Sequence, residues 1–237
     1  HSVQAMYEEA FFHLLNKLIQ KYNLDNLAIA GGCAMNSVAN GKVLLKTPFK
    51  KIYIQAAAGD AGGAIGAALT TWHKTIGEKS KKRITPHSHA YWGPSFKNDY
   101  IRDLLNTQKK RIETENCIME NFSEISKLTK LTAAEIANGK VIGWFQGKME
   151  WGPRALGNRS IICDPRRSDM KDILNLKIKR RESFRPFAPS ILLEDVSNWF
   201  EQTDDVPFMM QVYQIIKSKR SEIPAVTHVD GSGRLHT

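Results

Sequence analysis

The sequence predicts an α/β fold, which becomes α+β when the whole chain is considered. The first observation behind this prediction is that two short apolar runs, at 27–30 and 51–55, each lead through a glycine-containing loop into a helix-like segment. A repeated order of strand, loop and helix is typical of an α/β domain. The second is that the 237 residues are 42% hydrophobic, enough for a sizeable core. We expect two domains.

The first predicted elements follow from local spacing. Between 6 and 22, apolar residues recur at three- and four-residue intervals, which predicts a helix with one buried face. The apolar run at 27–30 predicts a buried strand. Gly31-Gly32 then predicts a tight turn into a helix over about 34–45.

The same order is predicted a second time. A strand at 51–55 leads through the loop 56–60 into another helix. The glycines and alanines of 62–68 would let another backbone approach this helix closely. Each of the two predicted strands is therefore followed by a loop that leads to the start of a helix.

A change of composition divides the chain. Residues 79–94 are polar and basic around two prolines, so we place a linker there, between a domain at 1–78 and a domain at 95–237. The chain stops in a strand-like run at 235–237 without a closing element, so we expect it to be a piece of a longer polypeptide. In the second domain we expect helices near 99–105, 123–138 and 167–177, and strands near 141–146, 160–163 and 189–193.

Positive charge is concentrated in one stretch. The formal net charge is +10, and residues 143–189 hold eleven Lys and Arg side chains against five Asp and Glu. Such a region favours anionic partners: nucleotides, carbamoyl or acyl phosphates, or nucleic acid. Charge alone does not choose among them.

Cysteine usage and hydropathy exclude several classes of protein. Cys33, Cys117 and Cys163 form no Cys-x-x-Cys pair, so we expect neither a disulfide framework nor a structural zinc site, and the reducing cytoplasm is the expected compartment. Cys33 is predicted to be a small buried residue rather than a nucleophile. No apolar run is long enough to span a bilayer, and the first residues do not resemble a signal peptide.

Three arginines are the best candidates for ligand contact. Within 147–160, basic residues alternate with glycine and proline, which fix the backbone and let a ligand approach closely. Arginine offers a planar bidentate fork for phosphate. A solvated basic face explains the lysines of 171–179 well, but not an arginine held between prolines and aromatic residues. We therefore predict ligand contact at Arg154, Arg159 and Arg185.

Other candidates are weaker when taken singly. Gly31, Gly32 and Asn36 could meet a nucleotide at a helix start, although a close strand-to-helix crossing explains them equally well. Asp60 could hold a metal ion beside phosphate, but an N-cap is the simpler interpretation and a metal site would need partners. His228 lies in a glycine-containing segment that an ordinary turn explains as readily as a site.

Taken together, these segments resemble the NodU-type O-carbamoyltransferases, a family whose members modify nodulation factors, cephalosporin precursors and aminoglycosides. Five motifs in the same order are far more specific than any one of them. The matching motifs are AGGCAMN at 30–36, AAGDAGG at 57–63, MEWGPRALGNRS at 149–160, FRPFAP at 184–189 and THVDG at 227–231.

The resemblance implies a domain order and a reaction. Residues 1–78 would be the end of an actin- and sugar-kinase-like α/β domain, and 95–237 most of a YrdC-like mixed α/β domain, truncated at its C-terminus. The YrdC-like part would convert carbamoyl phosphate and ATP to carbamoyl adenylate. The other part would pass the carbamoyl group to a hydroxyl of a small molecule or sugar, aided by a divalent metal, Mg or Fe.

The resemblance also implies roles for individual residues. Asp60 would be a metal ligand, with the remaining ligands outside this chain, and Gly31, Gly32 and Asn36 would bind adenosine. Catalysis would fall to Lys148, Arg154 and Arg185. Carbamoyl phosphate and ATP would be bound by Lys148, Arg154, Arg159, Arg185, His228 and Arg234. No membrane partner is expected, and a homodimer is among the assemblies to test.

Two alternatives stay open at this point. A basic RNA-binding module would use Trp144, Phe145 and Trp151 to stack on bases, although nucleic acid is the less favoured partner. A YrdC-like enzyme that makes threonylcarbamoyl adenylate for tRNA modification would instead use threonine as its acyl acceptor. The hydrogenase-maturation carbamoyltransferases are less favoured, because their zinc-binding cysteine pairs are not seen here.

Overall fold

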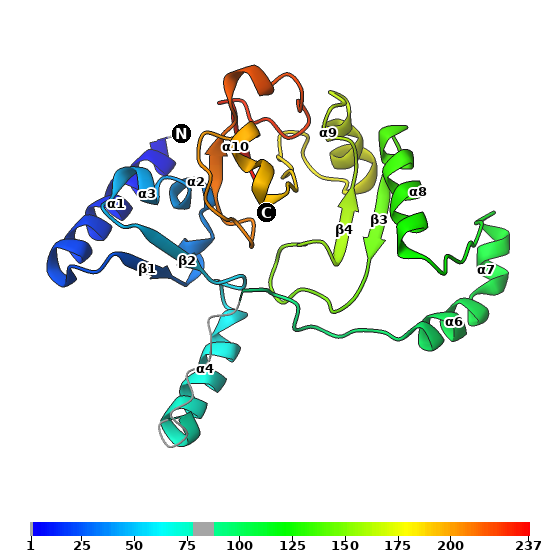
Figure 1. The fold of residues 1–237 in the computed structure, drawn as a ribbon, viewed down its shortest axis with the longest axis horizontal. Helices are drawn as coiled ribbons and strands as arrows, with labels where there is room; N and C mark the ends of the chain where they lie inside the picture. The colour runs from blue at the N-terminus through cyan, green and yellow to red at the C-terminus, as the bar shows by residue number, and fades with distance from the viewer. Residues whose placement is uncertain (1, 78–87) are drawn as a thin grey trace. The chain divides into compact units, whose positions relative to one another are not determined.

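A computed structural model describes residues 2–77 and 88–237, and it mixes helices and strands as the predicted α/β class requires (Figure 1). The chain divides into two compact units. The first contains the described parts of His1–Ala90 together with Trp151–Leu156 and Pro165–Thr237, and the second contains Tyr91–Glu150 and Gly157–Asp164. Most of the predicted linker at 79–94 lies outside the described residues.

The first unit begins with the predicted helix and strand pair. Helix α1 (Ser2–Tyr22) lies beside strands β1 (Asn26–Ile29) and β2 (Lys51–Ile54), which pair in parallel from Asn26↔Lys51 to Ile29↔Ile54 (Figure 1). The periodicity of α1 places Phe12 and Leu15 in a core, as expected for one buried face. That core also contains Leu27, Val43 and Phe49.

The helix predicted over 34–45 is wrong, because the chain breaks it into three short turns: η1 (Gly32–Met35), α2 (Ser37–Asn40) and α3 (Val43–Lys46). Asn36 ends the first and caps the second, accepting a hydrogen bond from the N–H of Ala39 at 3.2 Å. A Cβ at Gly41 would overlap the carbonyl oxygen of Val212, so close contact with a distant strand sets the second break. Cys33 is exposed on this segment, so its predicted burial is also wrong.

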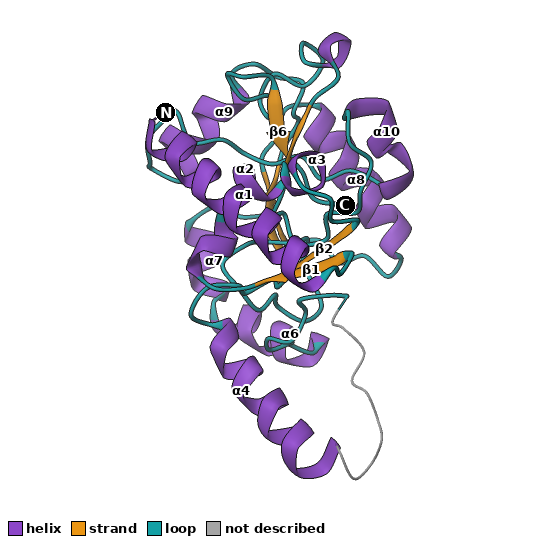
Figure 2. Cartoon of the chain, turned by 90° about the vertical axis from the view of Figure 1, so that its left-hand side faces the viewer, coloured by secondary structure: helices purple, strands orange, loops and turns teal. Residues whose placement is uncertain are grey.

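Helix α4 (Gly62–Trp72) is the predicted second helix, followed by η2 (His73–Gly77). It extends away from the β1–β2 pair (Figure 2) and has no buried residue. The expected close approach of another backbone is found at Gly62, where a Cβ would overlap the carbonyl oxygen of Ala57, whereas a Cβ at Gly63 or Gly66 would meet nothing within 4 Å.

The remainder of the first unit is built around an antiparallel pair that sequence patterns did not predict. Strands β5 (Val212–Gln214) and β6 (Ser232–Arg234) pair Val212 with Arg234, and they cover a core that includes Phe200, Tyr213, Ile215 and Leu235. The other elements of this part are α9 (Met170–Asp172), η3 (Ile173–Ile178), η4 (Leu193–Asp195), α10 (Val196–Trp199) and η5 (Lys217–Lys219). The helix predicted at 167–177 is thus present as α9 and η3.

The strand predicted at 189–193 is wrong. Only the single bridge Ser190↔His236 forms there, supported by bonds from Ile191 N–H to His236 O and from His236 N–H to Pro189 O. Pro186 and Pro189 have no N–H to extend the ladder, and the chain turns into η4 a few residues later.

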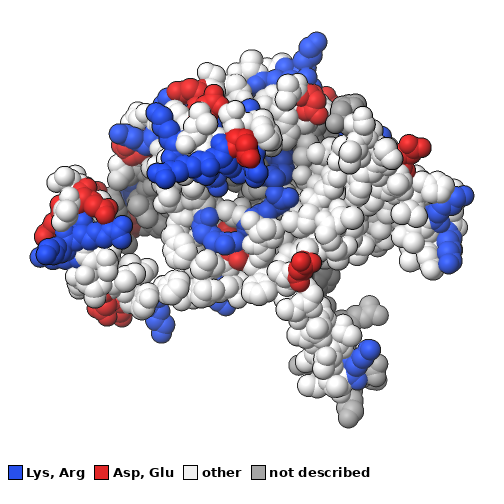
Figure 3. Space-filling model, turned by 180° about the vertical axis from the view of Figure 1, so that it is seen from behind, with Lys and Arg blue, Asp and Glu red and all other residues white. Residues whose placement is uncertain are grey.

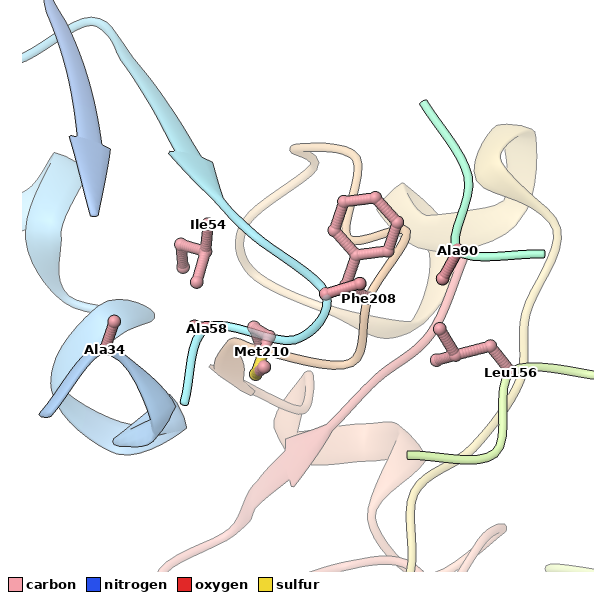
Figure 4. Close-up of a cluster of buried hydrophobic side chains, with 8 residues drawn as sticks. Ala34, Ile54, Ala58, Ala90, Leu156, Phe208 and Met210 are labelled. Atoms are coloured by element: carbon pink, nitrogen blue, oxygen red, sulfur yellow. The ribbon is translucent and has the colours of Figure 1, made fainter. Parts of the chain in front are cut away.

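A further core supports the loops that follow β1 and β2. It joins Ala34, Ile54 and Ala58 to Phe208 and Met210, with Ala56, Ala90 and Leu156 beside them (Figure 4). Met210 is only 2% exposed. The core therefore fixes the position of a thioether next to the loop that carries Arg154.

The second unit contains a two-stranded sheet and three helices. Strands β3 (Ile142–Phe145) and β4 (Arg159–Ile162) correspond to the strands predicted near 141–146 and 160–163, and they pair antiparallel. Helices α6 (Asn98–Thr107) and α8 (Ile125–Ala137) were predicted, whereas α7 (Lys109–Thr114) was not. All three cysteines of the chain are free thiols, and none of the described helices is both long and apolar enough to cross a membrane.

Candidate anion-binding site

Arg154 lies on a loop of the first unit that is anchored at two points. The backbone N–H of Trp151 donates to Ala90 O at 2.6 Å, and its indole N–H donates to Ala61 O at 3.3 Å. Trp151, considered for base stacking, thus has a structural contact. Nε of Arg154 donates to the sulfur of Met210 at 3.4 Å, and burial lowers the pKa of Arg154. A thioether is a weak acceptor, so this cation is poorly compensated.

Gly152 lets this loop pass close to the loop after β2. Its φ is +120°, and a Cβ would lie 2.8 Å from the carbonyl oxygen of Ala56. Gly152→Ala is expected to lower the free energy of unfolding by about 2 kcal/mol and to displace Arg154, because both the backbone conformation and the contact exclude a side chain. Urea denaturation measures the change. Gly66→Ala in the exposed α4, where a Cβ meets nothing within 4 Å, is the matched control and should not destabilise the protein; equal losses in both variants would contradict the prediction.

Arg234 is the most deeply placed cation of the site. It lies on β6, and its Nε is buried without a hydrogen-bond partner among the residues that the structure describes. Burial, together with the charges of Arg154 and Arg181, lowers the pKa of Arg234 to about 10. Arg234 therefore stays charged at pH 7, in a place where a buried donor without an acceptor is costly.

Arg181 completes the cluster, and sequence reasoning did not single it out. Its Nε donates to Oδ1 of Asn175 at 2.7 Å, and its guanidinium lies 4.8 Å from the centre of the Phe187 ring. Asn175 is fully buried and donates to Ser183 O and Arg185 O, at 3.1 and 2.9 Å. The FRPFAP motif at 184–189 contained a sequence signal for Arg181, because Phe187, its second aromatic residue, lies against the guanidinium of Arg181.

Arg154, Arg181 and Arg234 thus form a group of electrostatically coupled guanidinium groups, which we call the arginine cluster. Their mutual effect is repulsive, and no salt bridge to an Asp or Glu is formed by them within the part of the chain that the structure describes. Like charges brought together under burial destabilise the protein unless an anion joins them. Lys and Arg side chains also form a band on the face drawn in Figure 3.

Arg185, predicted to contact ligand, lies beside the cluster rather than within its buried part. Its side chain is 52% exposed, and its Nε donates to Oε2 of Glu182 at 2.7 Å. The charge of Arg185 contributes to lowering the pKa of Arg181, after burial. It is available as an outer cation of the same site, and its ligand contact stays a prediction.

His228 lies on the turn that leads into β6 and has a polar environment. Its Nδ1 is 3.1 Å from Oγ of Ser232, whose hydroxyl is 2.6 Å from Oδ1 of Asp230. Burial, with the charges of Arg234 and Lys171, lowers the pKa of His228 in spite of the opposing charge of Asp230. His228 is therefore neutral at pH 7, and it is electrostatically coupled to the arginine cluster through Arg234.

Lys148 and Arg159 belong to the second unit. Glu150 is buried there and organises the strand ends, accepting from the backbone N–H of Asn158 at 2.8 Å and from Nε of Arg159 at 3.0 Å. Asn158 in turn donates to the carbonyl oxygen of the exposed Lys148 at 2.7 Å. One N–H of Arg159 is thus committed to a carboxylate, and the predicted ligand contacts of Lys148 and Arg159 stay predictions.

The predicted nucleotide turn lies at the carboxyl ends of β1 and β2. The N–H of Gly31 donates to Ala58 O at 2.7 Å, so the two loops meet there, and Gly31 has a φ of +97° that favours glycine. Carboxyl ends of parallel strands are where α/β sheets bind ligands. Asn36, however, is already used: it caps α2 and exchanges hydrogen bonds with Gln4. Nucleotide binding by Gly31, Gly32 and Asn36 stays a prediction.

Asp60 lies on the second of these loops with an exposed side chain. It is not the N-cap of α4, since that position is Ala61 and no side chain caps it. Within residues 2–77 and 88–237, no three His, Cys, Asp or Glu side chains are grouped to hold a metal ion. The described residues therefore do not make a metal site around Asp60, and no chemical step is assigned to one.

A pocket of about 310 Å³ lies in the first unit and is lined mostly by apolar residues, among them Tyr53, Phe208 and Met210, whose sulfur accepts from Arg154. Its charged lining residue is Asp205. A carboxylate repels phosphate, so this pocket is not suited to the ligand that the arginine cluster favours.

The fold is that of an α/β protein, and its first unit brings three arginines together, one of which has a buried Nε without a partner among the described residues. Two models of one family match the chain: the carbamoyltransferase N-terminus over residues 1–69 and the carbamoyltransferase C-terminus over residues 133–237. The chain belongs to the carbamoyltransferase family. The resemblance stated from its motifs is thereby confirmed.

Similar proteins agree with this assignment. Nodulation protein NolNO of Sinorhizobium fredii is 41% identical over 240 residues, covering 100% of this chain and 34% of that protein. The 3'-hydroxymethylcephem-O-carbamoyltransferase of Amycolatopsis lactamdurans is 32% identical over 213 residues, covering 89% and 36%. An uncharacterized protein of Synechocystis is 42% identical over 257 residues, covering 100% and 41%. The chain thus spans between a third and about two fifths of these relatives.

Proposed function

We propose that this chain is the phosphate-binding part of an O-carbamoyltransferase that activates carbamoyl phosphate with ATP and transfers the carbamoyl group to a hydroxyl of a small molecule or sugar. Family membership supports the transferase class. The observation that carries the proposal is the arginine cluster, in which Arg234 keeps a buried Nε without a partner among the described residues. Such a group is best explained by a ligand with several negative charges.

The cluster suits the first half of the proposed reaction. Carbamoyl phosphate, ATP and one water give carbamoyl adenylate, phosphate and pyrophosphate, so an anhydride forms between two anionic reactants. Their repulsion must be neutralised before they approach, and pyrophosphate carries negative charge as it leaves. Fixed guanidinium groups do this electrostatically, without a covalent nucleophile.

The other predicted residues have proposed supporting roles. Arg185 would add an outer cation to the phosphates, and the turn at Gly31 and Gly32 would approach the adenosine. The ligand contacts of Lys148 and Arg159, which belong to the second unit, stay predictions. ATP is the proposed cosubstrate. A divalent metal at Asp60 would need ligands beyond the described residues.

Pyrophosphate release tests the proposal. The chain should release pyrophosphate from ATP when carbamoyl phosphate is present, and Arg154→Met should abolish that release. Release that depends on threonine and bicarbonate would identify the tRNA-modifying alternative. If neither ATP nor carbamoyl phosphate binds in calorimetric titration, the proposed function is wrong.

A further inference from the structure

The turn between His228 and Ser232 is rigid. The N–H of His228 donates to Ser232 O at 2.7 Å, and the N–H of Gly231 donates to His228 O at 2.9 Å. A Cβ at Gly231 would overlap the guanidinium of Arg220, which is itself held by Ile215 O at 3.0 Å. The imidazole of His228 is therefore carried on a backbone with little freedom.

The hydrogen bonds along this turn fix the tautomer of His228. Although burial acts against it, hydrogen bonds from Ser232 lower the pKa of Asp230, so the carboxylate is ionised and can only accept. The Ser232 hydroxyl therefore donates to Asp230 Oδ1, at 2.6 Å. Its oxygen then accepts from His228 at 3.1 Å, which requires a proton on Nδ1. In a neutral ring, Nε2 is left with a lone pair.

The lone pair on Nε2 of His228 is a hydrogen-bond acceptor, whereas the charged groups coupled to His228 include the donors of Arg234 and Lys171. Nε2 of His228 is buried and, among the described residues, has no hydrogen-bond partner. The cations coupled to His228 or to Arg234 are Lys171, Arg154 and Arg181. Lysine and arginine side chains carry only hydrogen-bond donors, so none of these cations can accept the hydrogen bond that another one offers. Arg234, two residues after Ser232, has a buried donor in the same situation. A ligand that satisfies both must combine a negative oxygen with an N–H or O–H group.

We propose that His228 Nε2 accepts a hydrogen bond from the amide of the carbamoyl group, and that this contact selects carbamoyl phosphate over acyl phosphates. The inference rests on the proposed function and assigns one residue of that site the choice of substrate. Carbamoyl phosphate offers an –NH₂ donor next to its anionic oxygens. An acetyl group places a methyl there and leaves Nε2 buried without a partner, which is the kind of mismatch that discriminates strongly.

Two stable ligands and two substitutions test the proposal on the 237-residue chain. Phosphonoacetamide carries the amide, and acetonylphosphonate has a methyl in its place, so the ratio of their dissociation constants isolates the N–H contact. His228→Asn keeps a donor where Nδ1 was, so the bond to Ser232 is retained, but it removes the acceptor at the Nε2 position. His228→Gln places an amide oxygen near that position and serves as the rescue.

The native chain is expected to prefer phosphonoacetamide by about 10- to 100-fold. His228→Asn should bring the ratio close to one, and His228→Gln should restore part of it. Arg154→Met should weaken both ligands equally, which separates the anion site from the selecting contact. Thermal melting of each variant identifies any that fails to fold. If His228→Asn does not fold, the ratio measured on the native chain still decides, because equal binding of the two ligands there rejects the selection.

Three results would overturn the inference. Equal binding of the two ligands by the native chain would leave the anion site standing but reject selection by His228. An unchanged ratio in His228→Asn with weaker ATP binding would place Nε2 against the nucleotide instead. Failure of the native chain to bind ATP, carbamoyl phosphate or either phosphonate would reject the proposed function along with the inference.

Discussion

Arg234→Met is expected to reduce the affinity for pyrophosphate by at least about 100-fold while raising the free energy of unfolding in anion-free buffer by about 1 kcal/mol or more. Methionine fills a similar space without placing a third positive charge beside Arg154 and Arg181. Removing a buried and uncompensated charge is stabilising, whereas the ligand loses a charge-assisted bond to the group that has no other partner. Calorimetric titration with pyrophosphate and urea denaturation without anions measure the two effects.

Arg102→Met is the matched control for this prediction. The side chain of Arg102 is 68% exposed and pairs only with Asp99 at the surface, so its replacement should change both quantities little. Pyrophosphate binding by Arg234→Met at native affinity would contradict the assignment of the cluster. A marked loss of stability in anion-free buffer would show that Arg234 is compensated after all.

Asn175→Leu is expected to lower the free energy of unfolding by about 2 to 4 kcal/mol and to weaken anion binding. The side chain of Asn175 is 0% exposed and satisfies the carbonyl oxygens of Ser183 and Arg185 while it holds Nε of Arg181. Leucine has a similar volume but leaves both carbonyls without their donor and releases Arg181 from its position. Urea denaturation and titration with pyrophosphate measure the two losses.

Asn198→Leu supplies the comparison, since Asn198 is exposed and makes a single long bond to Asp195 at 3.3 Å. Its effect on stability should stay within about 0.5 kcal/mol. If Asn175→Leu were as stable as Asn198→Leu, Asn175 would not organise the segment around Arg181. If stability fell without any loss of pyrophosphate affinity, Arg181 would not belong to the site.

Much of the fold could be predicted because its signals are local. Helix α1 and strands β1, β2, β3 and β4 follow from apolar spacing within each segment. The predicted helix at 34–45 is broken twice: Asn36 caps α2 at the first break, whereas the second depends on contact between Gly41 and Val212, which nothing within 34–45 reveals. Strand β5 is only three residues long and owes its place to the core around Tyr213 and Ile215. The prolines near Ser190 are a local signal against the strand predicted at 189–193, because proline has no N–H to donate to a neighbouring strand.

The site was predicted in part for a similar reason. Arg154 was predicted from a motif that fixes the backbone and Arg234 from the family resemblance alone, and both lie in the cluster. Arg181 was missed because its importance depends on Asn175 and Phe187, which contact it only in the folded chain. A basic stretch in the sequence shows how many charges there are, but it does not say which of them the fold brings together.

The contact between Arg154 and the sulfur of Met210 has a consequence for how the site would fill. Sulfur is a soft, diffuse electron donor, so the guanidinium gives up little enthalpy when it turns from the thioether to a phosphate oxygen. A carboxylate in the same place would compete with every incoming ligand. With Met210 there instead, the thioether holds the arginine in position, and an incoming phosphate would have only this weak bond to replace.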